Sequence, residues 1–125
     1  MYYKRMDIVL VDFGGDHEDS RIGDYRPAIV ISNNRYNYHS PVMQVLPMTK
    51  KLKLLDKEYH VFIDKEDCDG LTASGVCMVE QIQTVDQGQV KRKIAAVNEQ
   101  RLADKIDMAL KNQLGFGSGV SGDGF

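Results

Sequence analysis

The chain has 125 residues, 42% of them hydrophobic and 27% charged, which suits one folded domain and excludes a largely disordered protein. The formal net charge of −2 and a pI of about 5.9 exclude the globally basic surface of a protein that coats nucleic acid. The first residues carry no signal-peptide pattern, and no apolar run approaches the ~20 residues that span a bilayer, so we expect a cytoplasmic protein.

The first half of the chain predicts four short strands separated by polar segments. The runs of β-branched and aromatic residues that indicate these strands are 7–13, 26–32, 42–48 and 60–64. The loop 14–25, rich in glycine and acidic residues, is long for a hairpin connection and is therefore a candidate functional loop. We expect residues 33–41 to form a turn-rich connector, and 50–57 a basic connector with one helical turn at 52–55.

The second half predicts two more strands, a helix and a tail. Residues 76–84 indicate a fifth strand and 89–95 a short sixth. A helical period follows, carried by Leu102, Ile106, Ala109, Leu110 and Leu114. Asn98 is the expected N-cap of this helix and Gly115 its C-terminal stop. We therefore expect a domain at 1–114 and a flexible glycine-rich tail at 115–125.

Five or six short strands followed by one helix predict a mainly β protein. The architecture that accommodates them is a small, partly open β-barrel with the C-terminal helix packed across it. Such a barrel leaves strand edges exposed, and a homodimer is one way to cover them.

Arg26 and Thr49 are the first candidates for chemistry, because each stands at an end of a predicted strand. A guanidinium matches a phosphate in geometry and bonds it bidentately, and a nearby hydroxyl can donate to a developing oxyanion. The alternative for Arg26 is a structural ion pair with an acidic residue of the preceding loop. The alternative for Thr49 is a local bond to the backbone.

A second group of residues is suited to reading RNA bases. Glu80 and Gln81 offer a carboxylate and an amide, which can bond base edges, or they form the outward rim of a sheet. Glu18, beside His17 in the long loop, and His60, at the start of a strand, are either site residues or solvated surface residues.

Two further sets of residues could contact RNA: a cluster of amides and tyrosines, and two basic runs. Asn33 opens a cluster of amides and tyrosines that could bond and stack unpaired bases, although a turn of this composition needs no ligand. The basic runs at 50–53 and 91–93 are local positive patches or ordinary solvated faces. Cys68 and Cys77 lack metal-ligand spacing to each other and to the histidines, so we expect free thiols and no metal site.

Several motifs in order resemble one known family. D-I-V-L-V-D-F, R-P-A-I-V-I-S-N, P-M-T, H-V-F-I and E-Q-I-Q-T-V-D, followed by an amphipathic helix, resemble the MazF/PemK toxin ribonucleases of toxin–antitoxin pairs, from Lys4 to about Leu114. The resemblance implies an SH3-like, CcdB/MazF-like β-barrel homodimer. It also implies cofactor-free and metal-independent cleavage of single-stranded RNA at short sequences, and neutralisation by an acidic antitoxin whose complex binds DNA.

The resemblance also assigns roles to individual residues. Arg26 falls on the arginine of the R-P motif and Thr49 on the threonine of P-x-T, the catalytic pair, while Glu80 and Gln81 fall on the pair near the RNA. The implied products are a 2′,3′-cyclic phosphate and a 5′-OH. Gln83 stands where the family has arginine and is the main support for one alternative, a non-catalytic binding module on the same fold. A CcdB-like toxin that binds gyrase without cleaving anything is the other alternative.

Two further departures separate the chain from the family pattern. Met6 occupies the position of a usual glycine before Asp7. The loop between His17 and Arg26 is about three residues longer than usual, so the resemblance does not fix the place of His17.

Overall fold

The computed structural model describes residues 2–14, 25–52 and 58–116. The strands within these ranges are β1 (Asp7–Asp12), β2 (Tyr25–Val30), β3 (Val42–Thr49), β4 (His60–Ile63), β5 (Cys68–Asp69), β6 (Gly75–Met78), β7 (Gln83–Asp86) and β8 (Val90–Val97). The helices are α1 (Asn34–His39) and α2 (Gln100–Leu114), with short 3-10 turns at Lys65–Asp67, Val79–Gln81 and Gln87–Gln89. None of the helices in this described part is long and apolar enough to cross a membrane.

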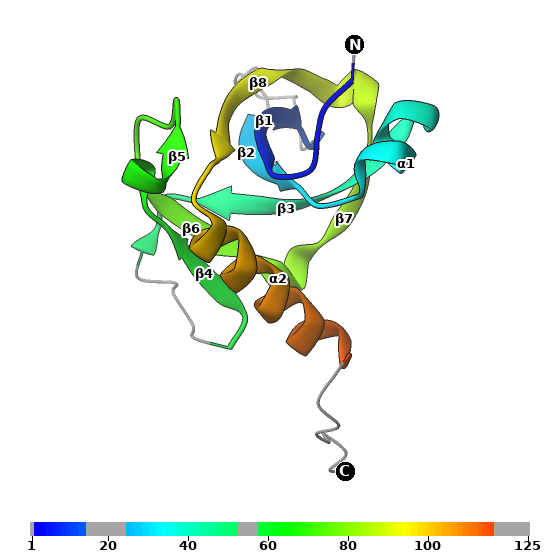
Figure 1. The fold of residues 1–125 in the computed structure, drawn as a ribbon. Coiled ribbons are helices and arrows are strands. Elements are labelled where there is room, and N and C mark those ends of the chain that lie inside the picture. The colour runs from blue at the N-terminus through cyan, green and yellow to red at the C-terminus, as the bar shows by residue number, and fades with distance from the viewer. Residues whose placement is uncertain (1, 15–24, 53–57, 117–125) are drawn as a thin grey trace.

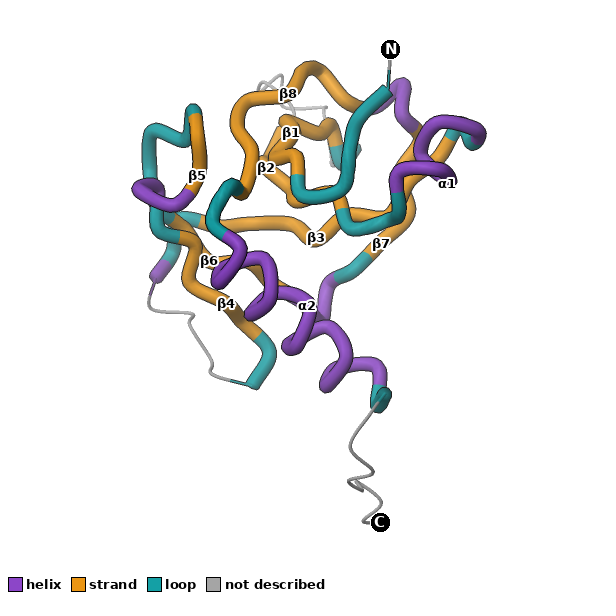
Figure 2. Tube along the Cα trace, in the orientation of Figure 1, coloured by secondary structure: helices purple, strands orange, loops and turns teal. Residues whose placement is uncertain are grey.

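The strands form one strongly curved sheet that nearly closes on itself (Figure 1). Its order is β4-β6-β3-β2-β1-β8-β5, with β7 also paired to β3, and the neighbouring strands run antiparallel. α2 packs against β4 and the turn at Val79–Gln81 (Figure 2). This architecture confirms the predicted fold class of a small, mainly β barrel with one C-terminal helix.

Both faces of the central strands are buried, because side chains alternate between two cores. Ile29, Leu46 and Met48 belong to the larger core, which also receives Leu102 and Ile106 from α2. The smaller core lies on the opposite face, and its members are Val9, Val11, Ala28, Val30, Met43, Val45 and Val85. Alternation therefore assigns Arg26 and Thr49 to the face of the smaller core, at the end of their strands.

Two segments differ from the sequence prediction. Residues 33–41 contain the helix α1, whose first turn is capped by Asn33: its Oδ1 accepts from the Tyr36 amide at 2.8 Å. The predicted strand 76–84 is instead two strands separated by the 3-10 turn at Val79–Gln81. Pro47 lies within the predicted third strand, now β3, and is opposite Ala28.

The C-terminal helix begins one residue later than the sequence indicates. Glu99, not Asn98, is the N-cap of α2, and the Asn98 side chain instead accepts from the Asp69 amide at 2.7 Å, which ties the helix start to β5. The predicted stop is confirmed, because Gly115 has a left-handed φ of 78° and its amide bonds carbonyls of the last turn. The helical turn expected at 52–55 lies mostly outside the described residues.

The N-terminal segment is fixed to both the sheet and α2. Met6 adopts a φ of 76°, in the left-handed region where a glycine would be unstrained, and its amide bonds the Val30 carbonyl at 2.7 Å. The preceding Arg5 forms an ion pair with Asp107 on α2 and donates from Nε to the Ile31 carbonyl at 2.9 Å. These bonds hold Met6 in its left-handed conformation, although glycine is the usual residue at this position.

The packing of α2 makes a stability prediction. Leu102 is 4% exposed in the larger core, so Leu102→Ala should lower the free energy of unfolding by about 2–5 kcal/mol through lost burial and a residual cavity. Arg101→Ala, at the exposed neighbouring position, should change it by less than about 0.5 kcal/mol. Denaturant unfolding at one fixed protein concentration measures both, and equal small losses would contradict the packing described.

Candidate active site

Arg26 and Thr49 meet at one end of the β2–β3 ladder. The two strands pair antiparallel with Ala28 opposite Pro47, and the same register continued by two residues sets Arg26 opposite Thr49. Residues that lie opposite each other project from the same face of a sheet. Arg26 is exposed and Thr49 half-buried, and by this register both side chains project from the same face. We call this place the catalytic end of the ladder.

The surroundings of Thr49 orient its hydroxyl. Thr49 Oγ1 accepts a hydrogen bond from the Lys51 amide at 3.2 Å, so the hydroxyl hydrogen can be donated elsewhere. On its other side Thr49 pairs with Val76 of β6. A Cβ on the adjacent Gly75 would lie only 2.8 Å from the Thr49 carbonyl oxygen, so glycine is required for this close approach.

His60 and Glu80 form a second polar pair. His60 Nε2 lies 3.3 Å from Glu80 Oε2, which joins β4 to the 3-10 turn. His60 lies opposite Met78 of β6, whereas Thr49 lies opposite Val76. The strand rise places these two rungs about 7 Å apart along β6. The pair is thus next to the catalytic end rather than part of it.

The 3-10 turn arises from a change of register along β3. β6 pairs with the end of β3 and β7 with its first half, and the register shifts by three residues between them. The three residues Val79–Gln81 absorb this shift and leave the sheet. Gln81 is exposed on the turn beside Glu80. Both residues therefore stand out from the sheet instead of forming the rim of a strand.

The other predicted site residues are not brought to the catalytic end. Asn33 follows the far end of β2, where it caps α1. Glu18 and its neighbour His17 lie outside the described residues. Of the basic patches, Lys91 places its ammonium 5.1 Å from the centroid of the Tyr25 ring, immediately before Arg26 in the chain.

Sequence reasoning missed a small hollow beside Thr49. Its volume is about 140 Å³, and it is lined by Pro27, Met48, Thr49, Lys50, residues 71–75 and Ile94. The residues 71–75 lie between the predicted strands 60–64 and 76–84, and none of them is a predicted site residue. The one signal in the sequence was Gly75 at the entrance of a strand, where glycine marks a close approach of two backbones.

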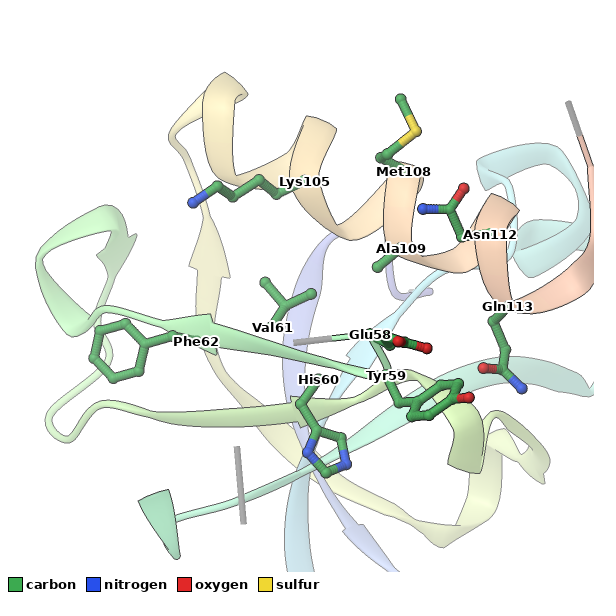
Figure 3. Close-up of a pocket in the computed structure, with 10 residues that line it drawn as sticks. All are labelled: Glu58, Tyr59, His60, Val61, Phe62, Lys105, Met108, Ala109, Asn112 and Gln113. Carbon is green, nitrogen blue, oxygen red and sulfur yellow. The ribbon is translucent and has the colours of Figure 1, made fainter. Parts of the chain in front are cut away.

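A larger groove of about 730 Å³ is lined by residues of β4 and α2 (Figure 3). Val61 points from β4 toward α2, whereas His60 points away from it. Tyr59, Phe62 and Met108 line the groove with more than 40% of each side chain exposed. The groove therefore presents apolar surface, and its lining also includes His60 of the His60–Glu80 pair.

The two thiols are buried and unreactive in character. Burial, with the charges of Asp67 and Asp64, raises the pKa of Cys68 to about 11, and burial, with Glu80, raises the pKa of Cys77 further still. Both therefore stay protonated near neutral pH and neither is suited to act as a nucleophile. Within the described ranges, no group of three or more His, Cys, Asp or Glu side chains is arranged to hold a metal ion.

Solved structures with the same fold include proteins from mycobacteria and from Deinococcus radiodurans. A mycobacterial endoribonuclease in complex with its cognate antitoxin is 20% identical, with a TM-score of 0.76 over 93% of this chain and 98% of that one. MazF from Deinococcus radiodurans is 21% identical, with a TM-score of 0.73 over 93% and 99%. The MazE–MazF complex from D. radiodurans is 23% identical, with a TM-score of 0.71 over 94% and 99%. At these identities the likeness establishes the fold.

The family follows from the sequence model that the chain matches. Residues 4–114 match the model described as PemK-like, MazF-like toxin of type II toxin–antitoxin system. The match spans every strand and both helices of the described structure. The chain therefore belongs to the PemK-like and MazF-like toxins of type II toxin–antitoxin systems.

Proposed function

We propose that this protein is a toxin endoribonuclease that cuts single-stranded RNA at a short sequence without a metal ion. The observation that carries the proposal is the β2–β3 register, which sets Arg26 and Thr49 on one face at one strand end. That pair supplies a charge and a hydrogen-bond donor to a single phosphate. The RNA substrate and the free thiols suit the cytoplasm, where we expect the protein to act.

The proposed reaction is an internal transesterification. The 2′-oxygen of the nucleotide before the cut bonds to the adjacent phosphorus, and the bond from phosphorus to the 5′-oxygen breaks. The 2′-hydroxyl gives up its proton to a base, and the leaving oxygen takes up a proton. The products are a 2′,3′-cyclic phosphate and a 5′-OH. Because the nucleophile belongs to the substrate, no metal is required to activate a water molecule.

Arg26 and Thr49 have distinct roles in this scheme. Arg26 offsets the charge that builds on the phosphorane, and Thr49 donates to a non-bridging oxygen with the hydrogen that its bond from Lys51 leaves available. A guanidinium with a pKa above about 12 is a poor base, so we assign Arg26 to charge and not to proton removal. Glu80 is the fallback base, and His60 beside it positions its carboxylate.

Base recognition is proposed to start at the 3-10 turn. Glu80 accepts from an exocyclic amine and Gln81 bonds a base edge bidentately, because both leave the sheet. The loop residue Glu18 and the α1 cap Asn33 remain proposals as substrate contacts, and the capping bond supports a structural role for Asn33.

Two protein partners complete the proposal. A second copy of the chain packs on the apolar groove between β4 and α2, which would cover Tyr59, Phe62 and Met108 in a homodimer. A cognate antitoxin neutralises the enzyme with an acidic segment that competes with RNA. The solved relatives that contain an antitoxin support this partner. DNA binding would belong to the toxin–antitoxin complex.

The roles of the catalytic pair can be separated by substitution. Arg26→Ala and Thr49→Val should each lower kcat about 10²–10³-fold, because each removes one stabilising contact to the phosphorane. Thr49→Ser keeps the hydroxyl and should stay within about tenfold of the wild type. Arg35→Ala, on exposed α1, is the matched control and should leave kcat unchanged. A near wild-type rate for Arg26→Ala would overturn the site assignment.

The reaction class has its own test. Incubation of the purified protein with a mixed single-stranded RNA in EDTA should give full activity, and mapping of the ends should show 5′-OH groups at one recurring short sequence. Loss of activity on chelation would contradict the metal-independent scheme. Intact RNA together with inhibited gyrase supercoiling would favour the CcdB-like alternative, and intact RNA without such inhibition would favour a binding module.

A further inference from the structure

The helix α1 is held in place by the amides of the cluster that the sequence suggests for RNA contacts. Asn33 caps its first turn, and Asn34 Oδ1 accepts from the Arg5 amide at 2.7 Å. Asn37 is 1% exposed and donates from Nδ2 to the Ser32 carbonyl at 2.9 Å. These three amides therefore serve the fold, and the tyrosine rings of the cluster are left exposed.

Three aromatic side chains gather at α1. Tyr38 is 64% exposed. The centroid of its ring lies 5.0 Å from that of Tyr2, with the planes at 79°, and 4.9 Å from that of His39, with the planes at 90°. Edge-to-face contacts of this kind stabilise the orientation of a ring. We call Tyr2, Tyr38 and His39 the aromatic patch, and its rings are ordered before any ligand binds.

The chain around the aromatic patch carries basic residues and no acidic ones. Residues 2–6 and 31–42 contain no Asp or Glu, although the net charge of the whole chain is −2. Lys4, within the first of these segments, is exposed. The adjoining carboxylates of Asp7 and Asp107 are each held in an ion pair. The local charge therefore suits a polyanion.

A nucleic acid with unpaired bases fits these features better than a protein does. Exposed aromatic rings stack on bases of any sequence, while basic neighbours follow the backbone. The anchors of protein interfaces instead fill desolvated pockets. Neither the hollow beside Thr49 nor the groove of β4 and α2 is lined by α1, and α1 contains no aliphatic side chain. The exposed ring of Tyr38 is therefore suited to stacking on an unpaired base.

The aromatic patch lies far from the catalytic end. α1 connects the ends of β2 and β3 that lie away from Arg26 and Thr49, and Figure 1 shows it on the opposite side of the barrel from the arrowhead of β3. The rise per residue along β3 separates its two ends by about 23 Å. At the ~3.4 Å per nucleotide of a stacked strand, about seven nucleotides span this distance. A strand of only a few nucleotides therefore cannot occupy both places.

We propose that the aromatic patch is a second RNA-binding surface, where Tyr38 stacks on an unpaired base about seven nucleotides from the scissile phosphate. The inference rests on the proposed ribonuclease function, because the cut phosphate defines where this strand begins. It goes beyond that function, since the patch adds affinity for long strands and takes no part in the chemistry.

The affinity for an uncleavable strand tests the proposal. A 2′-O-methyl oligouridine of about 16 nucleotides is titrated by fluorescence anisotropy. Tyr38→Ala should raise its Kd at least about fivefold, because the stacking contact is lost. Tyr38→Phe keeps the ring and should keep the wild-type Kd. An unchanged Kd for Tyr38→Ala would overturn the proposal.

Two controls make the binding result specific to stacking. Phe116→Ala removes an equally exposed ring, 63% against 64% for Tyr38, beyond the end of α2, and should leave the Kd unchanged. A blunt RNA duplex of the same length has no unpaired base along it, so Tyr38→Ala should not weaken its binding. An equal loss in Phe116→Ala, or an equal loss on the duplex, would rule out stacking at the patch.

Cleavage separates this inference from the proposed function. Once a cleavage sequence is mapped, substrates of about 4 and about 16 nucleotides that contain it are compared. Tyr38→Ala should raise KM for the long substrate at least about fivefold with kcat unchanged, and should leave kcat/KM for the short substrate unchanged. Equal losses on both substrates would contradict a separate surface. If the protein cleaves no RNA, the proposed function fails, and the anisotropy result still decides on the patch.

The integrity of the Tyr38→Ala protein is checked by circular dichroism and size-exclusion chromatography. Because Tyr38 is mostly exposed, the variant should keep the wild-type spectrum and elution volume. Elution as a smaller species would identify the patch as a subunit contact and refute the RNA assignment. If the variant does not fold, Tyr2→Ala, which removes an edge contact of the Tyr38 ring, should raise the Kd of the single strand in its place. An unchanged Kd there would count against the patch.

Discussion

The register between β2 and β3 is the constraint on which the candidate active site depends. Both faces of these strands are buried, with Ile29 and Leu46 in one core and Val30 and Val45 in the other. A slip of one residue in either strand would exchange the faces of its side chains, so packing on both sides fixes the pairing. The same register delivers Arg26 and Thr49 to one face, and the geometry of this proposed catalytic pair is thus a consequence of core packing.

A second register, between β3 and the strands β6 and β7 on its other side, positions Glu80 and Gln81, the residues proposed to read bases. The register of β3 shifts by three residues between its pairing with β6 and its pairing with β7, and the turn at Val79–Gln81 accommodates this shift outside the sheet. Glu80 Oε2, on that turn, lies 3.3 Å from His60 Nε2. Gln83 begins β7 opposite Val45, one rung past this shift and away from the catalytic end. The departure from arginine at this position therefore leaves the Arg26–Thr49 ladder intact.

The parts predicted from the sequence are those that local pattern decides. The hydrophobic pattern predicts the four early strands and the helix around Leu102 and Ile106. Gly115 predicts the end of that helix, because glycine readily adopts a positive φ. The break at Val79–Gln81 has no such signal, because the run 76–84 contains no Gly, Pro, Asn or Asp, and only pairing along β3 imposes it. The sequence predicts Asn98 as a helix N-cap and Asn33 as part of a turn, yet Asn33 caps α1 and Asn98 accepts a hydrogen bond from the Asp69 amide of β5.

A double-mutant cycle on Arg26 and Thr49 tests the central claim most directly. The claim is that the two side chains act on one phosphate as a unit. If they do, kcat of the Arg26→Ala/Thr49→Val double variant, in EDTA on one mapped RNA, should be close to that of the slower single variant. Loss factors that multiply in the double variant would show independent roles and contradict the shared phosphate.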